Sequence, residues 1–238
     1  CSPRRLRGAR SGVRLPRARQ PPAGVRATLR AMTTLFSPTR FGDIAVESRL
    51  VMAPLTRNRA VGTVPNALMA EYYAQRADPA TGAGLIVAEA TQVSAMGQGY
   101  LDTPGCHTAA QVAGWKTITA AVHARGGRIA LQLWHVGRIS HTSLLGGNAP
   151  LSSTTVAAES RTLTTDGWQP CSAPRMLRED EMPGIVAEYA HAARCAMDAG
   201  FDGVEVHGAN GYLIDQHLRD SVNARTDGYG GSVPNRIR

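Results

Sequence analysis

Several absences narrow the classes of protein that this 238-residue sequence can encode. No apolar run approaches the 18 or so residues of a membrane span, so we expect a soluble protein with no membrane partner. The four cysteines form no CxxC pair, which argues against a disulfide framework or a zinc site and suits a reducing compartment. No HxH pair occurs either, so we expect no metal centre. The single lysine, Lys116, falls in a predicted helix, which disfavours a Schiff-base enzyme.

Acidic residues are missing from residues 1–31, which contain nine arginines. The rest of the chain holds 17 basic and 18 acidic residues, so the net charge of +8 comes from this leader and does not predict a nucleic-acid partner. An arginine-rich, acid-free N-terminus is typical of a transit peptide, which would direct the protein to a plastid or mitochondrion. The alternatives are a disordered basic tail and untranslated sequence upstream of Met32, and both leave the protein in the cytoplasm.

Beyond a leader that we place at residues 1–34, strand patterns alternate with helical ones. The predicted strands are 49–55, 83–93, 128–137 and 203–207, and the predicted helices are 67–77, 109–126 and 179–200. We also expect a hairpin near 41–47. The stretch 138–175, rich in Ser, Thr, Gly and Pro, is expected to be an excursion loop.

The alternation predicts an α/β fold with a parallel sheet, as either a doubly wound sheet or a (β/α)8 TIM barrel. No GxGxxG motif follows the first strand, which disfavours the dinucleotide-binding form of the doubly wound sheet. We therefore predict a TIM barrel. Four strand–helix units are half a barrel, so we expect residues 35–238 to be the N-terminal half of a longer domain.

Polar side chains gather where the fourth predicted strand ends. His207 and Asn210 can both donate hydrogen bonds to one carbonyl oxygen and stabilise negative charge on it. Tyr212, a phenol that stays protonated at neutral pH, can donate a proton to a carbanion-like carbon. The alternative reading is an ordinary loop with a capping asparagine and a core tyrosine.

Other candidates follow or interrupt the earlier strands. Gln132 lies within an apolar strand, where its amide needs a partner, either a flat heteroaromatic ligand or neighbouring backbone. Trp134 could line the same pocket. Pro54 and Thr56 follow the first strand, and Ala88 is expected at the end of the second, where a small residue lets a ligand approach the backbone.

Taken together, these stretches resemble the old yellow enzyme family of FMN-dependent ene-reductases, and most closely the plant and algal 12-oxophytodienoate reductases. The resemblance extends from about Leu35 to Arg238. It is carried by RLVMAPLTRNRA, EYYAQRA, GLIVAEATQVS, VAGWKTITAAVHARGGRIALQLWHVGRISH and GFDGVEVHGANGYLIDQHLRDSVNARTDGYGGSVPNRIR.

The resemblance implies a role for each matching position. His207 and Asn210 would hold the carbonyl oxygen of the substrate, and Tyr212 would donate the proton. Trp134 and Tyr100 would line the substrate side. The residues expected to contact FMN are Pro54, Leu55, Thr56, Ala88, Gln132 and His207.

The resemblance also implies a ping-pong reaction in which NADPH reduces FMN and leaves, and an α,β-unsaturated carbonyl compound then stacks on the reduced flavin. An arginine and the phosphate-binding loops of the family come from later strands, which this sequence does not contain. The alternative is an inactive truncated paralogue, or an interaction protein that binds no FMN.

Overall fold

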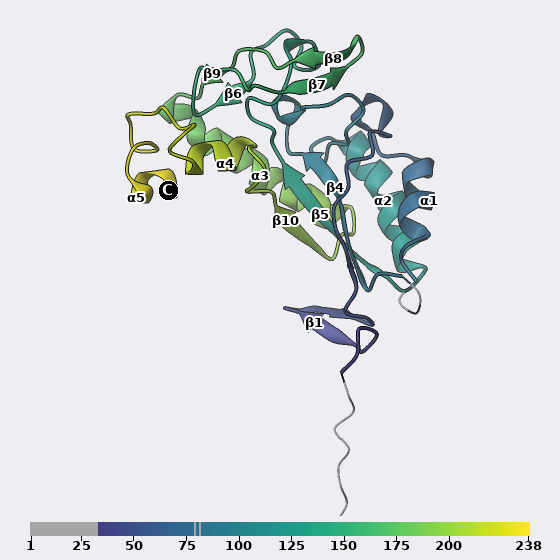
Figure 1. Cartoon of the computed structure of the whole chain (residues 1–238). Helices are drawn as coiled ribbons and strands as arrows, with labels where there is room; N and C mark the ends of the chain where they lie inside the picture. Colours follow the sequence, from purple (N-terminus) through teal and green to yellow (C-terminus); the bar gives the residue numbers. More distant parts are fainter. Residues whose placement is uncertain (1–32, 79, 81) are drawn as a thin grey trace, which may run out of the picture. The chain divides into compact units, whose positions relative to one another are not determined.

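Four parallel strands form the centre of the fold in a computed structural model, which describes residues 33–78, 80 and 82–238 (Figure 1). The strands are β3 (Val51–Met52), β4 (Leu85–Gln92), β5 (Arg128–Trp134) and β10 (Gly203–Val206), and each pairs with the next in chain order. A doubly wound sheet reverses its strand order at a switch point, whereas the strands of a barrel follow one another around the wall. The unbroken order confirms the predicted barrel architecture, of which the described residues supply four strands.

Three helices follow the predicted strand–helix alternation and cover one face of the sheet. They are α1 (Ala67–Ala74), α2 (Ala109–His123) and α3 (Met182–Asp198). Ile86 and Leu131 of the sheet are fully buried in one cluster with Trp115 and Ile118 of α2. α2 begins with a capping box in which the Thr108 side chain accepts from the amide of Gln111 and the Gln111 side chain accepts from the amide of Thr108, so two amides at its N-terminus are satisfied locally.

The opposite face of the sheet is closed at one end by a hairpin. Strands β1 (Thr39–Phe41) and β2 (Ile44–Val46) pair antiparallel, which confirms the hairpin expected near 41–47. Val46 packs in a small cluster with Leu85 and Ala130. Because side chains alternate along a strand, Gln132 and Trp134 lie further along the same face as Ala130.

A bulge in β4 changes the predicted position of Ala88. The register of β4 against β5 shifts between Ala88 and Thr91, and the strand continues to Gln92. The predicted strand 83–93 agrees with β4, but the expectation that Ala88 lies at its end is wrong. Ala88 is fully buried within the cluster on the helix side of the sheet.

The stretch predicted as one excursion loop contains two small sheets. Strands β6 (Leu151–Ser152) and β9 (Arg175–Met176) pair parallel, and β7 (Arg161–Thr164) and β8 (Gly167–Pro170) form a hairpin. The amide of Leu101 donates to the carbonyl of Leu163 at 2.8 Å, which ties that hairpin to the segment carrying Tyr100. Strands of two to four residues show no readable alternation, which is why the sequence did not reveal them.

Two short helices complete the described chain, α4 (Leu213–Leu218) and α5 (Val233–Arg236), together with short 3₁₀ turns at η1 (Val61–Thr63), η2 (Ala95–Gly97), η3 (Thr142–Leu144) and η4 (Glu179–Glu181). No helix in the described part of the chain is long and apolar enough to cross a membrane. Residues 1–32 of the predicted leader lie outside the described residues.

Candidate active site

β10 leads directly into the first candidate residue. The amide of His207 donates to the carbonyl of Leu133 at 3.0 Å and so extends the β10–β5 ladder by one residue. Burial lowers the pKa of the half-buried imidazole, although the Glu205 and Asp215 carboxylates act in the opposite direction. The Nδ1 atom accepts from the amide of Ala209 at 3.4 Å. A neutral ring whose Nδ1 accepts carries its proton on Nε2, which leaves that N–H available as a donor.

A left-handed turn follows His207 and reverses the chain. Asn210 and Gly211 have φ values of 59° and 78°, a region that glycine enters freely and asparagine tolerates better than most residues. The amide of Gly211 donates to Oδ2 of Asp215 at 2.7 Å. The turn places the exposed Asn210 and then Tyr212, the N-cap residue of α4, after the end of β10.

Tyr212 joins an aromatic cluster at the ends of β5 and β10. Its ring meets Trp134 edge-on with centroids 4.9 Å apart, and it meets His207 in the same manner at 5.1 Å. Trp134 in turn stacks on Tyr100 at 5.8 Å. The structure therefore brings together four of the residues that the sequence placed in one site.

The electrostatics of this cluster keep the phenol of Tyr212 protonated. Burial raises the pKa of Tyr212, and the neighbouring Tyr100 hydroxyl raises it further. The two hydroxyl oxygens lie 3.4 Å apart, and either can be the donor. A phenol in this setting holds its proton at neutral pH and can release it only to a strongly basic carbon or oxygen.

Gln132 lies on the face of the sheet that bears Trp134, and it is 6% exposed. Its Nε2 donates to Oε1 of Glu205 at 2.6 Å, and the two residues are register partners on β5 and β10. Its partner is therefore a charged side chain and not the neighbouring backbone. Its Oε1 accepts no hydrogen bond from the residues that the structure describes, and only one of its two Nε2 hydrogens is used, so the amide can still both donate and accept.

The remaining candidates lie at the opposite edge of the sheet from β10. Pro54, Leu55 and Thr56 follow β3, with Leu55 and Thr56 exposed and Pro54 half-buried. β4 and β5 separate this segment from His207. The strand ends thus place these residues on the same rim as the aromatic cluster, as expected of a parallel sheet, without contact between the two groups.

The sequence reasoning missed Gln216. This glutamine is 1% exposed, and its side chain bonds to residues from β6, from the exit of β5 and from the turn before Tyr212. The signal was weak, because Gln216 stands between Asp215 and His217 in YLIDQHL and three adjacent polar residues are typical of an exposed segment. The sequence could not identify its hydrogen-bond partners.

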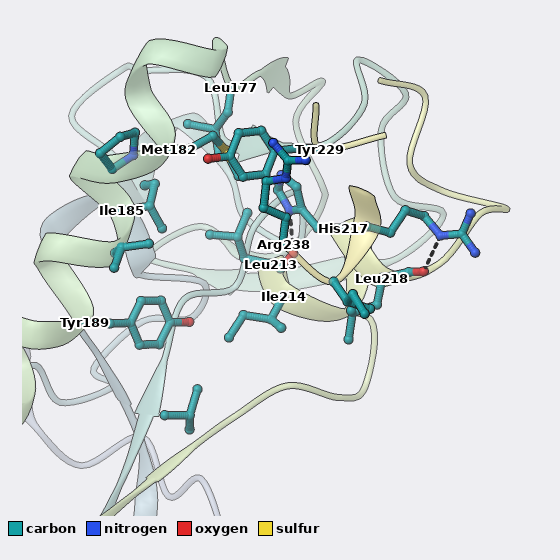
Figure 2. A pocket seen from close by; sticks show the side chains of 15 residues that line it. Leu177, Met182, Ile185, Tyr189, Leu213, Ile214, His217, Leu218, Tyr229 and Arg238 are labelled. Atoms are coloured by element: carbon teal, nitrogen blue, oxygen red, sulfur yellow. Dashed lines mark hydrogen bonds between the residues drawn. The ribbon is translucent and has the colours of Figure 1, made fainter. Parts of the chain in front are cut away.

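A separate cavity of about 380 Å³ lies between α3 and the segments α4 and α5 (Figure 2). Its lining includes Tyr189, Leu213 and His217, whose Nδ1 pairs with the carbonyl of Leu213 at 2.9 Å. None of the predicted site residues lines it. We place the candidate site at the strand ends because the donors and the proton source gather there. In the described residues, no group of three or more His, Cys, Asp or Glu could hold a metal ion.

Known proteins resemble the chain in sequence. It is 48% identical to 12-oxophytodienoate reductase 1 of Oryza sativa subsp. japonica over 218 residues, which cover 91% of this chain and 55% of that protein. It is 46% identical to the putative 12-oxophytodienoate reductase-like protein 2A of Arabidopsis thaliana over 204 residues, or 86% of this chain and 74% of the relative. The chain spans about half the length of most of these relatives.

Solved structures agree with the sequence matches. The old yellow enzyme homologue from Zymomonas mobilis superposes with a TM-score of 0.82 at 49% identity, over 86% of this chain and 57% of that one. Morphinone reductase in complex with tetrahydroNAD gives 0.81 at 48% identity, over 87% and 58%. The model of the NADH:flavin oxidoreductase / NADH oxidase family matches residues 34–238. The chain therefore belongs to the NADH:flavin oxidoreductase / NADH oxidase family, as its resemblance to old yellow enzymes predicted.

Proposed function

We propose that the intact protein containing this chain is an FMN-dependent reductase of carbon–carbon double bonds conjugated to a carbonyl group, with NADPH as reductant and a substrate like that of the 12-oxophytodienoate reductases. The observation that carries the proposal is the cluster at the end of β10. There, His207 offers an N–H donor and Tyr212 a retained proton, and their rings lie 5.1 Å apart.

The residues present fit the ring portion of FMN. Gln132 places a carboxamide in an otherwise apolar stretch of β5, with Oε1 open to accept from a ring N–H and the second Nε2–H open to donate to the adjacent ring carbonyl. The Thr56 hydroxyl is exposed after β3 and can donate to a ring carbonyl. Ala88 would contribute only backbone, because its side chain is buried on the helix side. The phosphate is assigned to none of the described residues.

When bound, FMN would supply the hydride that adds to the β-carbon of the substrate. As that bond forms, negative charge develops on the carbonyl oxygen. His207 Nε2–H and the Asn210 amide would donate to this oxygen, and two donors directed at one oxygen stabilise the charge that develops on it. The left-handed turn at Asn210 reverses the chain three residues after His207, which is the local structure that would bring the second donor toward the first.

Tyr212 would then deliver the proton to the α-carbon. Its raised pKa ensures that the phenol is protonated before each turnover at neutral pH. The Tyr100 hydroxyl, 3.4 Å away, can stabilise the phenolate that remains and help return a proton to it. Trp134 holds the Tyr212 ring edge-on, which restricts where the hydroxyl points.

Support for a nicotinamide reductant comes from morphinone reductase, which was solved with tetrahydroNAD bound. The preference for NADPH over NADH rests on the resemblance to 12-oxophytodienoate reductases. Comparing kcat/KM for the two nucleotides tests it, and equal values would remove the preference while leaving the reductase proposal intact.

The deciding experiment is to purify the intact protein and record its visible absorbance, then mix it with NADPH and afterwards with a cyclic enone under anaerobic conditions. We expect flavin absorbance that bleaches with NADPH and returns with the enone, along with loss of the enone double bond. A colourless protein, or one whose bleached flavin returns only with oxygen, would contradict the proposal and favour an inactive relative or interaction protein.

A further inference from the structure

Gln216 connects three segments that surround the candidate site. Its Nε2 donates to the carbonyl of Gly211 at 2.7 Å and to the carbonyl of Val136 at 3.0 Å. Its Oε1 accepts from the amide of Arg138 at 3.1 Å and from the hydroxyl of Ser152 at 2.9 Å. All four hydrogen-bonding positions of the carboxamide are thus used, in a side chain that is 1% exposed.

These bonds hold the turn that carries the proposed donors. Gly211 lies between Asn210 and Tyr212, so the bond to its carbonyl fixes the peptide unit that leads into Tyr212, while the bond from its amide to Asp215 fixes the unit that follows Asn210. The main chain adds to the hold, because the amide of Gln216 donates to the carbonyl of Tyr212 at 2.8 Å. Val136 and Arg138 follow β5, which ends at Trp134, the residue on which the Tyr212 ring packs.

The exit of β5 is shaped to admit this carboxamide. Gly137 has a φ of 63°, and a Cβ there would collide with Oε1 of Gln216. Position 137 therefore requires glycine for two reasons, the left-handed backbone conformation and the space needed by the Gln216 side chain. The nearby Ser153 hydroxyl also donates to the main-chain carbonyl of Gln216 at 2.6 Å, so the main chain of Gln216 is held as well as its side chain.

We infer that Gln216 is a positioning residue that sets the Tyr212 phenol relative to Trp134 at the end of β5. The inference rests on the proposed function for its effect on turnover. Its physical basis is that the carbonyls of Val136 and Gly211 both accept from the Gln216 side chain, which only a group with two N–H bonds can provide. A change that keeps the shape of the side chain but removes these donors should therefore loosen the turn.

The test is Gln216→Glu in the intact protein, with Gln111→Glu as the matched control. Gln111 is also buried, at 3% exposed, but lies in α2, far along the chain from the turn. We expect Gln216→Glu to keep its flavin and to be reduced by NADPH within about twofold of the parent. Its reoxidation by an enone should slow about 10- to 100-fold, the cost typical of a misplaced reacting group. Gln111→Glu should not separate the two half-reactions.

A double variant shows whether the effect passes through Tyr212. In the Tyr212→Phe background, Gln216→Glu should slow enone reduction by less than about threefold, because the group it positions is gone. An equal factor in both backgrounds would overturn the inference, as would equal slowing of both half-reactions. If Gln216→Glu fails to fold, Ser152→Ala, which removes one of the four bonds, should show the same separation at a smaller size. Equal slowing of both half-reactions there would also overturn the inference.

Amide hydrogen exchange decides the inference even if the proposed function fails. We expect the amides of Gly211 and Tyr212 to exchange at least tenfold faster in Gln216→Glu than in Gln111→Glu. A parent protein that reduces no enone would end the proposed function, and the exchange data would then stand alone. Unchanged exchange at both amides would show that Gln216 does not hold the turn.

Discussion

The hydroxyl oxygens of Tyr100 and Tyr212 lie 3.4 Å apart although 112 positions separate the two residues. Tyr100 belongs to a segment held by the β7–β8 hairpin through Leu101, and Tyr212 belongs to a turn held by Gln216. Two independently anchored loops therefore meet at one pair of phenols. This meeting point gives the proposed acid a neighbour that can stabilise its phenolate.

We predict that Tyr212→Phe separates the two half-reactions of the intact protein. Phenylalanine keeps the edge-on packing on Trp134 but has no proton to give. Flavin reduction by NADPH should stay near normal, while reoxidation by an enone should slow by about 10²- to 10⁴-fold, or less if water substitutes as the acid. Anaerobic stopped-flow traces of each half-reaction measure both values.

Tyr100→Phe is the matched control, because it removes the same group from the neighbouring ring. We expect a smaller effect on the enone step than that of Tyr212→Phe. A nitroalkene, whose anion persists without immediate protonation, should keep its rate of hydride acceptance in both variants. Equal slowing of the NADPH and enone steps in Tyr212→Phe would point to a damaged flavin site and would contradict the role of acid.

A second prediction concerns Asn210. Replacing it with alanine removes one of the two donors proposed for the carbonyl oxygen, and the side chain is exposed, so the fold should tolerate the loss. Enone and phenol binding should weaken together by about 1–3 kcal/mol. Titration of the oxidised protein with a para-substituted phenol gives the affinity directly. Unchanged phenol affinity would remove Asn210 from the proposed clamp.

A third prediction links stability to pH through His135. This buried histidine has its pKa lowered to about 3 by burial and by His217. Protonation therefore favours the unfolded chain: the stability from keeping His135 neutral is complete above about pH 6.5 and is lost as pH falls toward 3. The slope should be about 1.4 kcal/mol per pH unit for this one residue.

His135→Asn keeps an acceptor for the Gly137 amide, which now bonds to Nδ1 at 3.1 Å, but it cannot be protonated. Urea unfolding at several pH values should give a shallower loss of stability below pH 6.5 than in the parent. The difference in pH dependence between the variant and the parent reports the contribution of His135 apart from that of the other buried histidines. His141→Asn, in the loop after β5, is the control for a histidine-to-asparagine substitution elsewhere. Parallel curves for His135→Asn and the parent would contradict the prediction.

The sequence predicted the central sheet well, because its strands are apolar on both faces and end at recognisable residues. β10 is the clearest case, since VEV leads into His207 and the structure continues the ladder to that residue. The sequence predicted the length of β4 but could not predict its bulge after Ala88. A bulge is set by pairing with a neighbouring strand, and pairing leaves no local pattern.

The candidate site was predictable to the same degree. His207, Asn210 and Tyr212 are close in sequence, so a turn after a strand necessarily places them near one another. The contact between Tyr212 and Tyr100, the Glu205 partner of Gln132 and the four bonds of Gln216 join distant segments. A buried polar residue needs a hydrogen-bond partner, but only the fold determines which residue supplies it.

The last prediction separates stability from cofactor binding at Gln132. In Gln132→Glu, two carboxylates would replace the 2.6 Å bond between Nε2 of Gln132 and Oε1 of Glu205, so the free energy of unfolding should fall by about 1–3 kcal/mol. Adding Glu205→Gln restores a donor–acceptor pair with the direction reversed, and it should recover most of the stability.

The double variant should nevertheless retain FMN poorly, because a carboxylate at position 132 can accept from a ring N–H but cannot supply the second Nε2–H that we propose donates to the adjacent ring carbonyl. Chemical unfolding of the apoprotein and dialysis of the loaded protein measure the two properties separately. Recovery of both properties in Gln132→Glu/Glu205→Gln would mean that the pair serves only the fold. Recovery of stability alone would place the Gln132 amide against the flavin, with Glu205 as the residue that orients it.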